Sequence, residues 1–199
     1  MFRKRRHFGF HPKIVEMREF EETERSARTD TLTGLANRRV FRAAESRDDY
    51  TGMGTTLVSL LVADQRVILG HVGDSRIYRL SGDDFGPVTQ DDSWAAALRA
   101  QGLSHEELSR HPMRHVLTNV VGARDQVNVH VAEMPIAPGD CFLLCSDGLY
   151  EPLGDALMRD LLSSEPGPKA AAGALVRHAL DRGARDNVTA LVVRVGDGA

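Results

Sequence analysis

The chain has 199 residues and a formal net charge of −3, and hydrophobic residues make up 42% of it against 27% charged residues. This composition supplies enough apolar material for a core, so it excludes disorder throughout the chain. We expect a cytoplasmic protein with no membrane partner, because no apolar run approaches ~20 residues and no apolar signal segment follows the basic first residues.

Charge is unevenly distributed along the chain. Residues 1–50 carry an excess of Lys and Arg, whereas residues 51–199 carry an excess of Asp and Glu. We interpret residues 1–50 as an N-terminal helical or linker segment and residues 51–199 as the main domain. The Arg-rich start is typical of a solvated tail, so no nucleic-acid partner is expected.

The N-terminal segment predicts two short helices. Hydrophobic residues spaced among many charges predict an amphipathic or linker helix in residues 13–28. A turn is expected to end near Gly34, and Asn37 is expected to cap the following helix.

Short β-like runs begin after Gly52. The first three predict a meander of antiparallel strands, at residues 55–62, 66–71 and 76–80. Further strands are predicted at residues 127–134, 141–146 and 187–195, and helices at residues 155–162 and 169–181. Strands in runs with helices clustered later favour an α+β fold, a layered sheet sandwich with helices outside.

Two short helices are predicted between the strands. Asp91 or Asp92 is expected to cap a helix that runs to about Gln101. Ser104 and Glu107 have the spacing of a capping box and predict the start of a second helix.

Cys141 and Cys145 are the only cysteines, and both lie in a run typical of a buried strand. Four steps along a strand separate two Cα atoms by about 13 Å, which is too far for a disulfide. Two buried free thiols fit a reducing compartment.

Aspartates stand at the ends of several apolar runs, namely Asp74, Asp147 and Asp186. Burying a carboxylate beside apolar strands is costly unless the group is paired, hydrogen-bonded or bound to a metal. Acids that converge from separate strand ends make an oxygen-rich site that suits Mg²⁺ or Mn²⁺ rather than zinc. Taken singly, each aspartate is better explained as a turn or helix cap, because Asp-Gly and Asp-Asn are common turn dipeptides.

Six motifs occur in order over about 145 residues of the chain. They are Gly52-Met-Gly-Thr-Thr-Leu-Val58, His71-Val-Gly-Asp-Ser-Arg-Ile-Tyr78, Val88-Thr-Gln-Asp-Asp-Ser93, His111-Pro-Met-Arg114, Leu143-Leu-Cys-Ser-Asp-Gly-Leu149 and Arg185-Asp-Asn-Val-Thr189. In this order the chain closely resembles the bacterial metal-dependent type 2C (PPM) serine/threonine protein phosphatases. The resemblance implies a four-layer αββα sandwich, here missing its first strands and carrying a helical N-terminal appendage.

The same resemblance implies a set of site residues. Asp147 and Asp186 resemble ligands of a two-metal site that holds Mn²⁺ or Mg²⁺, and Asp91 resembles the aspartate of a third, weaker metal. The family's usual Asp-His-Ser is Asp91-Asp92-Ser93 in this chain. Supporting roles are implied for Asp74, Arg76, Gly148 and Asn187.

The implied activity is hydrolysis of phosphoserine and phosphothreonine by a water molecule that two metal ions activate. Its partners would be phosphorylated proteins and a serine/threonine kinase. No side chain is implied as a nucleophile, and burial of both cysteines argues against thiolate chemistry. Two alternatives stay open, a catalytically impaired phosphatase-like binding module and a truncated fusion product. They arise because the family's early Arg, Glu-Asp and Asp-Gly-Met-Gly-Gly motifs are not found.

Residues 30–41, Asp-Thr-Leu-Thr-Gly-Leu-Ala-Asn-Arg-Arg-Val-Phe, resemble the opening of diguanylate cyclase (GGDEF) domains. The motif that names that family does not occur in the chain, so no cyclase activity is implied. A gene fusion, a degraded gene or a misassembled reading frame would each join such a start to a phosphatase.

Overall fold

The structure is a computed structural model that describes residues 22–63, 65–113 and 115–196. Within these residues the strands form two antiparallel sheets. The three-stranded sheet has the order β1-β2-β5, with β1 at Leu57–Ala63, β2 at Arg66–Val72 and β5 at His130–Pro135. The four-stranded sheet has the order β4-β3-β6-β7, with β4 at Asp84–Pro87, β3 at Arg76–Ser81, β6 at Cys141–Cys145 and β7 at Ala190–Arg194.

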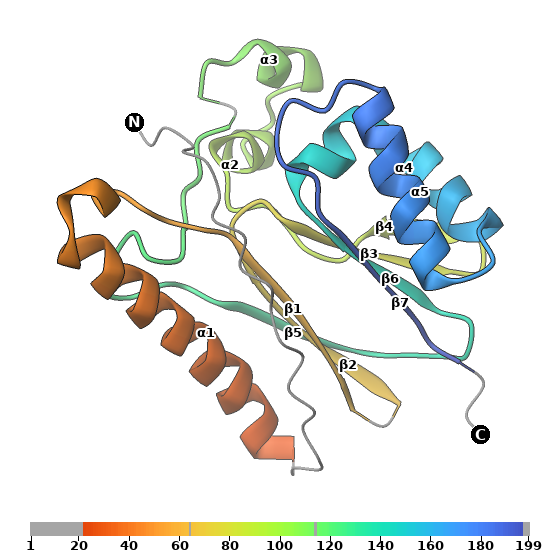
Figure 1. Ribbon diagram of the computed structural model, residues 1–199, viewed down its shortest axis with the longest axis horizontal. Helices are drawn as coiled ribbons and strands as arrows, with labels where there is room; N and C mark the ends of the chain where they lie inside the picture. Colours follow the sequence, from red (N-terminus) through yellow and green to blue (C-terminus); the bar gives the residue numbers. More distant parts are fainter. Residues whose placement is uncertain (1–21, 64, 114, 197–199) are drawn as a thin grey trace.

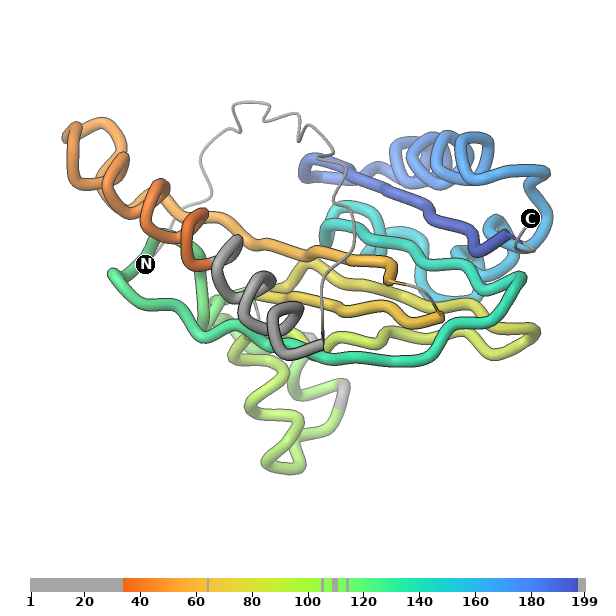
Figure 2. Tube along the Cα trace, turned by 90° about the horizontal axis from the view of Figure 1, so that it is seen from below, coloured from red at the N-terminus to blue at the C-terminus, as the bar shows by residue number. Residues whose placement is uncertain are grey.

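Helices cover the outer faces of both sheets (Figure 1). Helix α1, Glu22–Ser46, lies along the three-stranded sheet, whereas α4, Asp147–Ser164, and α5, Pro168–Asp181, lie over the four-stranded sheet. The view in Figure 2 shows the sheets stacked between these helices. This arrangement confirms the predicted α+β sandwich.

The remaining helices are short. A 3-10 helix, η1 at Asp48–Tyr50, follows α1, and α2 at Trp94–Ala100 and α3 at His105–Arg110 lie together at one end of the sandwich (Figure 1). Ser104 and Glu107 form the predicted capping box of α3. No helix in the described part of the chain is long and apolar enough to span a membrane.

Strand β6 is the centre of the core, and all five of its residues are buried. Because side chains alternate along a strand, Phe142 and Leu144 pack between the two sheets, whereas Leu143 packs beneath α4 and α5. The continuous apolar run predicted this strand, and burial on both faces explains why it shows no polar alternation.

The predicted break in the N-terminal segment is wrong, because α1 continues through Gly34 and Asn37. Asn37 caps no helix. It is buried, its Nδ2 donates to the carbonyls of Arg124 and Asp125, and its Oδ1 accepts from Gly122 N at 2.7 Å. These distant bonds satisfy a side chain that otherwise favours helix caps. Residues 13–21 of the helix predicted over 13–28 lie outside the described residues.

The predicted meander is also wrong after its first two strands. Strands β1 and β2 pair, but β3 pairs with β4 and β6 in the other sheet. The chain passes between the sheets at Gly73, whose φ of +101° favours glycine and whose α-carbon lies against Thr56.

The cap of α2 is Ser93 rather than either preceding aspartate. Ser93 Oγ accepts from Ala96 N at 3.2 Å. Asp91 and Asp92 do not cap because their carboxylates bind other parts of the chain, as described below.

Candidate active site

The sheet order brings together chain segments that are far apart in the sequence. In the four-stranded sheet Arg76 lies opposite Cys145, and Cys145 lies opposite Ala190. The start of β3, the end of β6 and the start of β7 therefore share one end of the sheet. Asp147 follows β6 after one residue and Asp186 shortly precedes β7, so both predicted metal ligands belong to this end.

Close backbone contact joins the segments of Asp147 and Asp186. A Cβ atom added at Gly148 would lie 2.5 Å from the carbonyl oxygen of Asn187, so only glycine fits there. Ser146 Oγ donates to the same carbonyl at 3.0 Å and accepts from Thr189 N at 3.1 Å. The two predicted supporting residues thus hold the aspartate-bearing loops against each other.

Each of these aspartates is also oriented by its own loop. Asp147 Oδ1 accepts from Gly148 N at 2.9 Å, and Asp186 Oδ1 accepts from Asn187 N at 2.8 Å. Asp147 occupies the first turn of α4, where the helix dipole favours a negative charge. Carboxylate oxygens are the ligands that Mg²⁺ and Mn²⁺ prefer, so this donor set fits the cations that the fold implies.

Arg76 and Asp91 form a bidentate ion pair. Arg76 Nε lies 2.7 Å from Asp91 Oδ1, and its second terminal nitrogen, Nη2, lies 2.8 Å from Oδ2. Burial acts to lower the pKa of Arg76, but Asp91 and two neighbouring tyrosines outweigh it, so the pKa lies above its ordinary value. A cation would have to compete with the guanidinium group for Asp91, whose role as a third-metal ligand stays a prediction.

Tyr150 links Arg76 to the turn that contains Asp74. The guanidinium carbon of Arg76 lies 3.8 Å from the centre of the Tyr150 ring, a cation–π contact. The Tyr150 hydroxyl donates to the backbone carbonyl of Asp74 at 3.0 Å. Burial raises the pKa of Tyr150, which therefore stays a phenol. No sequence motif singled out Tyr150, because its contacts depend on the meeting of α4 and β3.

Asp92 also binds this turn, through the backbone N–H of Gly73. Its Oδ2 accepts from Gly73 N at 3.0 Å and from Asn119 Nδ2 at 2.8 Å. Its Oδ1 lies 2.8 Å from His130 Nε2, and the buried His71 lies beside this pair. The sequence predicts no role for either histidine, because their proximity depends on the pairing of β2 with β5.

Neither cysteine has the exposure or the lowered pKa that a reactive thiol needs. Both thiols are free and buried in β6. Burial raises the pKa of Cys145 to about 12 and raises that of Cys141 as well. This agrees with the expectation that neither thiol is a nucleophile.

The sequence profile of the family Protein phosphatase 2C matches residues 13–193. The chain belongs to this family. The match includes residues 30–41, the segment that resembles a cyclase opening.

Relatives support this assignment. The serine/threonine phosphatase stp of Listeria innocua is 35% identical over 158 residues, which are 79% of this chain and 63% of that protein. The structure of the Streptococcus agalactiae serine/threonine phosphatase superposes with a TM-score of 0.84 at 29% identity, covering 90% of this chain and 74% of that one. The catalytic domain of the phosphatase PstP, solved with two manganese ions, gives a TM-score of 0.77 at 33% identity over 86% of this chain and 71% of that one.

The chain thus spans less than two thirds of the length of the curated Listeria relatives that it matches.

Proposed function

We propose that the chain is a metal-dependent protein phosphatase that hydrolyses phosphoserine and phosphothreonine. The observation that carries the proposal is the meeting of the Asp147 and Asp186 loops, held together by Gly148 against Asn187, in a chain of the phosphatase 2C family. The relatives named serine/threonine phosphatases support the choice of substrate class.

In this proposal Asp147 and Asp186 hold the divalent cations. The manganese ions bound to the related PstP favour Mn²⁺ over Mg²⁺. When bound, such cations supply Lewis acidity that activates water and neutralises the phosphoryl oxygens.

Other residues of the chain position these acids. Asp91 fixes the guanidinium group of Arg76, and Tyr150 packs on it and binds the carbonyl of Asp74. The first turn of α4, which carries Asp147, is therefore tied to the β2–β3 turn. This bracing keeps the carboxylates in place without requiring a nucleophilic side chain.

The biological setting follows as part of the proposal. Phosphorylated proteins would be the substrates, and a serine/threonine kinase would add the phosphates that this chain removes. The unpaired thiols of Cys141 and Cys145 support a reducing, cytoplasmic setting.

The division of the chain at residue 50 is likewise a proposal. The bonds of Asn37 to residues 122–125 and the family match from residue 13 weigh against an independent domain at residues 22–46.

Hydrolysis of a phosphothreonine peptide by the purified chain, with and without Mn²⁺, tests the proposal. We expect Mn²⁺-dependent phosphate release that Asp147→Asn abolishes. Asp160→Asn is the matched control, because Asp160 lies on the exposed face of the same helix and pairs only locally with Arg159.

Three outcomes separate the alternatives. Equal rates for wild type and Asp147→Asn would contradict the assignment of the site. Binding of the phosphopeptide without turnover would favour the binding module. A chain that melts without cooperativity and associates on sizing would favour a truncated product.

A further inference from the structure

Two histidines lie directly opposite each other on neighbouring strands. His71 on β2 pairs in register with His130 on β5. Directly opposed residues of an antiparallel pair project from the same face of the sheet, with Cβ atoms about 5 Å apart. The imidazole rings are 5.8 Å apart between centroids. Two rigid strands therefore hold the rings close together without any loop.

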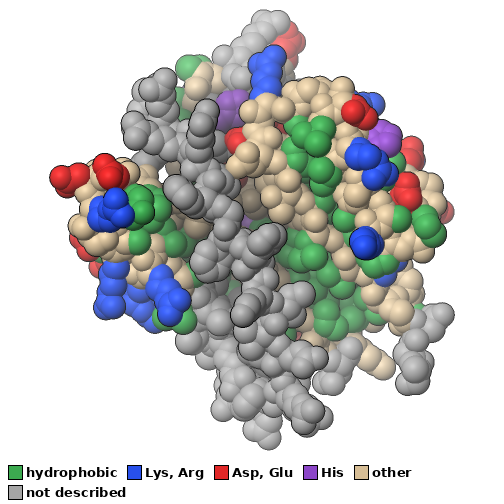
Figure 3. Space-filling model, viewed as in Figure 1, with side chains coloured by type: hydrophobic (Ala, Val, Ile, Leu, Met, Phe, Trp, Pro, Cys, Tyr) green, Lys and Arg blue, Asp and Glu red, His purple; other side chains and the backbone are tan. Residues whose placement is uncertain are grey.

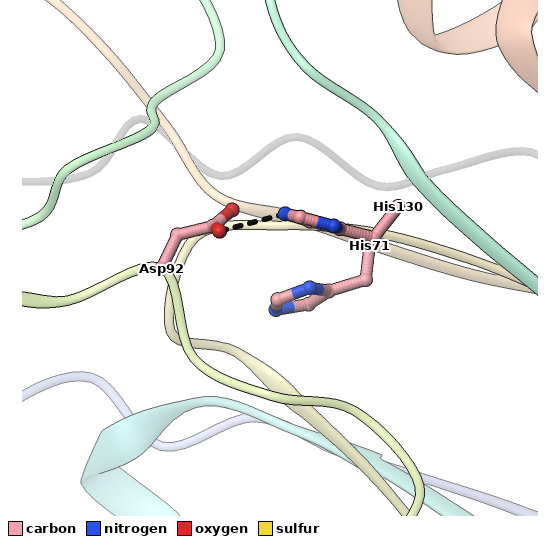
Figure 4. Close-up of side chains that lie close together, drawn as sticks. All are labelled: His71, Asp92 and His130. Carbon is pink, nitrogen blue, oxygen red and sulfur yellow. Dashed lines mark hydrogen bonds and ion pairs between the residues drawn. The ribbon is translucent and has the colours of Figure 1, made fainter. Parts of the chain in front are cut away.

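Asp92 completes a group of three metal-binding side chains (Figure 4). One ligand atom from each of His71, Asp92 and His130 lies within 4.8 Å of the other two. Asp92 Oδ1 is 2.8 Å from His130 Nε2, while Asp92 Oδ2 is held by Gly73 N and Asn119 Nδ2. Hydrogen bonds that fix the second oxygen of a ligating carboxylate are typical of built metal sites.

One ring nitrogen of His71 lacks a hydrogen-bond partner within the described residues. His71 is only 3% exposed, and its Nε2 has no hydrogen-bond partner among the residues that the structure describes. A buried polar atom left in this state costs free energy, which a metal ligand bond would offset. Burial lowers the pKa of His71, although the charge of Asp92 acts to raise it. A lowered pKa favours the neutral imidazole, which is the form that binds metals.

The group also has access to solvent. A pocket of about 270 Å³ is lined by His71, Asp92 and His130 together with residues of β2, β5 and the segment 88–91. The side chain of His130 is half exposed at its rim. An ion can therefore enter, and room remains for a water or another ligand.

We propose that His71, Asp92 and His130 form a transition-metal site, best suited to Zn²⁺ and distinct from the carboxylate pair Asp147 and Asp186. Two imidazoles and one carboxylate are a donor set that Zn²⁺ accepts with a fourth position open, whereas Mg²⁺ prefers oxygen ligands alone. The ion joins β2, β5 and the segment before α2, so its binding stabilises the three-stranded sheet.

An ordinary ion pair between Asp92 and His130 accounts for only part of the geometry. It explains the 2.8 Å contact, but it leaves Nε2 of the neighbouring His71 without a partner. A shared metal ion satisfies all three groups at once.

Co²⁺, which takes the geometry of Zn²⁺ and absorbs visible light, is the probe for the test. The full chain is first stripped with a chelator and then kept in excess Mg²⁺, so that the oxygen-rich site is occupied. We expect Co²⁺ to give the intense visible absorption of a four-coordinate site with nitrogen ligands, and Zn²⁺ to abolish that band and to raise the melting temperature.

His130→Gln is the main variant, because its half-exposed side chain can change without disturbing the core. It should lose both the absorption band and the Zn²⁺-induced rise in melting temperature. His178→Gln, at an exposed position of α5, should keep both. Asp147→Asn should keep both as well, which separates this site from the one proposed for catalysis.

Retention of the band and the melting shift by His130→Gln would overturn the proposal, as would their loss in Asp147→Asn alone. If His130→Gln melts differently from wild type before metal is added, Asp92→Asn is the second variant. Its amide oxygen can still accept from Gly73 N, and retention of the Co²⁺ band in this variant would also count against the site.

Discussion

All five residues of β6 in the four-stranded sheet are buried, whereas in β5 of the three-stranded sheet only Met134 is even partly buried. Position in the sheet accounts for part of the difference, because β6 is paired on both sides whereas β5 is an edge strand, and the outer layers add to it. Two helices, α4 and α5, bury a cluster of large side chains against the four-stranded sheet, and among the described helices only α1 lies along the other (Figure 1). On the face seen in Figure 3, acidic and basic side chains are intermingled around hydrophobic ones over α5.

The contrast between β6 and β5 parallels a contrast between the two proposed metal sites. Asp147 and Asp186 extend from the well-buried sheet, whose packing fixes them through the backbone. The group of His71, Asp92 and His130 lies where the buried strand β2 meets the exposed edge strand β5, and polar contacts hold it. The following substitutions test whether stability really differs in this way.

Leu143→Ala should have the largest effect, a loss of about 4 kcal/mol of unfolding free energy, because a fully buried leucine leaves a cavity beneath two helices. Val131→Ala on β5 is the control, since its side chain is 39% exposed. Denaturant unfolding monitored by circular dichroism measures both. Similar losses of unfolding free energy in the two variants would contradict the contrast between β6 and β5.

Asn37→Ala should cost about 3 kcal/mol, because it leaves the buried Gly122 N without its acceptor and two carbonyls without a donor. Arg39→Ala, on the exposed side of α1, should change little. Hydrogen exchange should show faster opening of β5 in Asn37→Ala than of β6. Equal acceleration of both strands would mean that α1 does not specifically support the three-stranded sheet.

The features predicted correctly from the sequence were those set by neighbouring residues. Strand β6 followed from one unbroken apolar run, and the capping box of α3 from residues three apart. Asn37 was misassigned because its partners lie 85 to 88 residues away. A local preference for helix caps carries no information about such partners.

The candidate site shows the same limit. Asp147 and Asp186 were predicted as ligands because motifs surround them, and the antiparallel pairing of β6 with β7 brings their segments to one end of the sheet. The opposition of His71 and His130 depends on the register of β2 with β5, which are far apart in the sequence. The switch between sheets at Gly73 depends on how the sheets pack, and no local run of residues encodes it.

Asp140→Asn should cost about 2 kcal/mol at neutral pH, because the buried carboxylate accepts from Arg79 at 2.6 Å and from Ala137 N at 2.9 Å. Burial alone would raise the pKa of Asp140, but these hydrogen bonds outweigh it and hold the pKa below its usual range. A depressed folded-state pKa stabilises the protein above the unfolded value of about 4, and this contribution is lost as the pH falls through the folded value.

The difference in unfolding free energy between wild type and Asp140→Asn should therefore be largest near neutral pH and shrink below about pH 4. Urea titrations across this range measure it. A difference that is constant with pH would mean that the charge of Asp140 contributes nothing.

Glu133→Gln should have the smallest effect, below about 0.5 kcal/mol, although Glu133 also forms an ion pair with an arginine. Its partner Arg66 lies 2.9 Å away across the three-stranded sheet, but the two side chains are 43% and 56% exposed. Water screens such a pair, and ordering two long side chains offsets much of the attraction. The small loss should disappear in 1 M salt, where the Debye length is about 3 Å, whereas that of Asp140→Asn should largely persist because burial limits screening. If Glu133→Gln cost as much as Asp140→Asn, the three-stranded sheet would be held by its surface charges, and the contrast drawn from burial would fail.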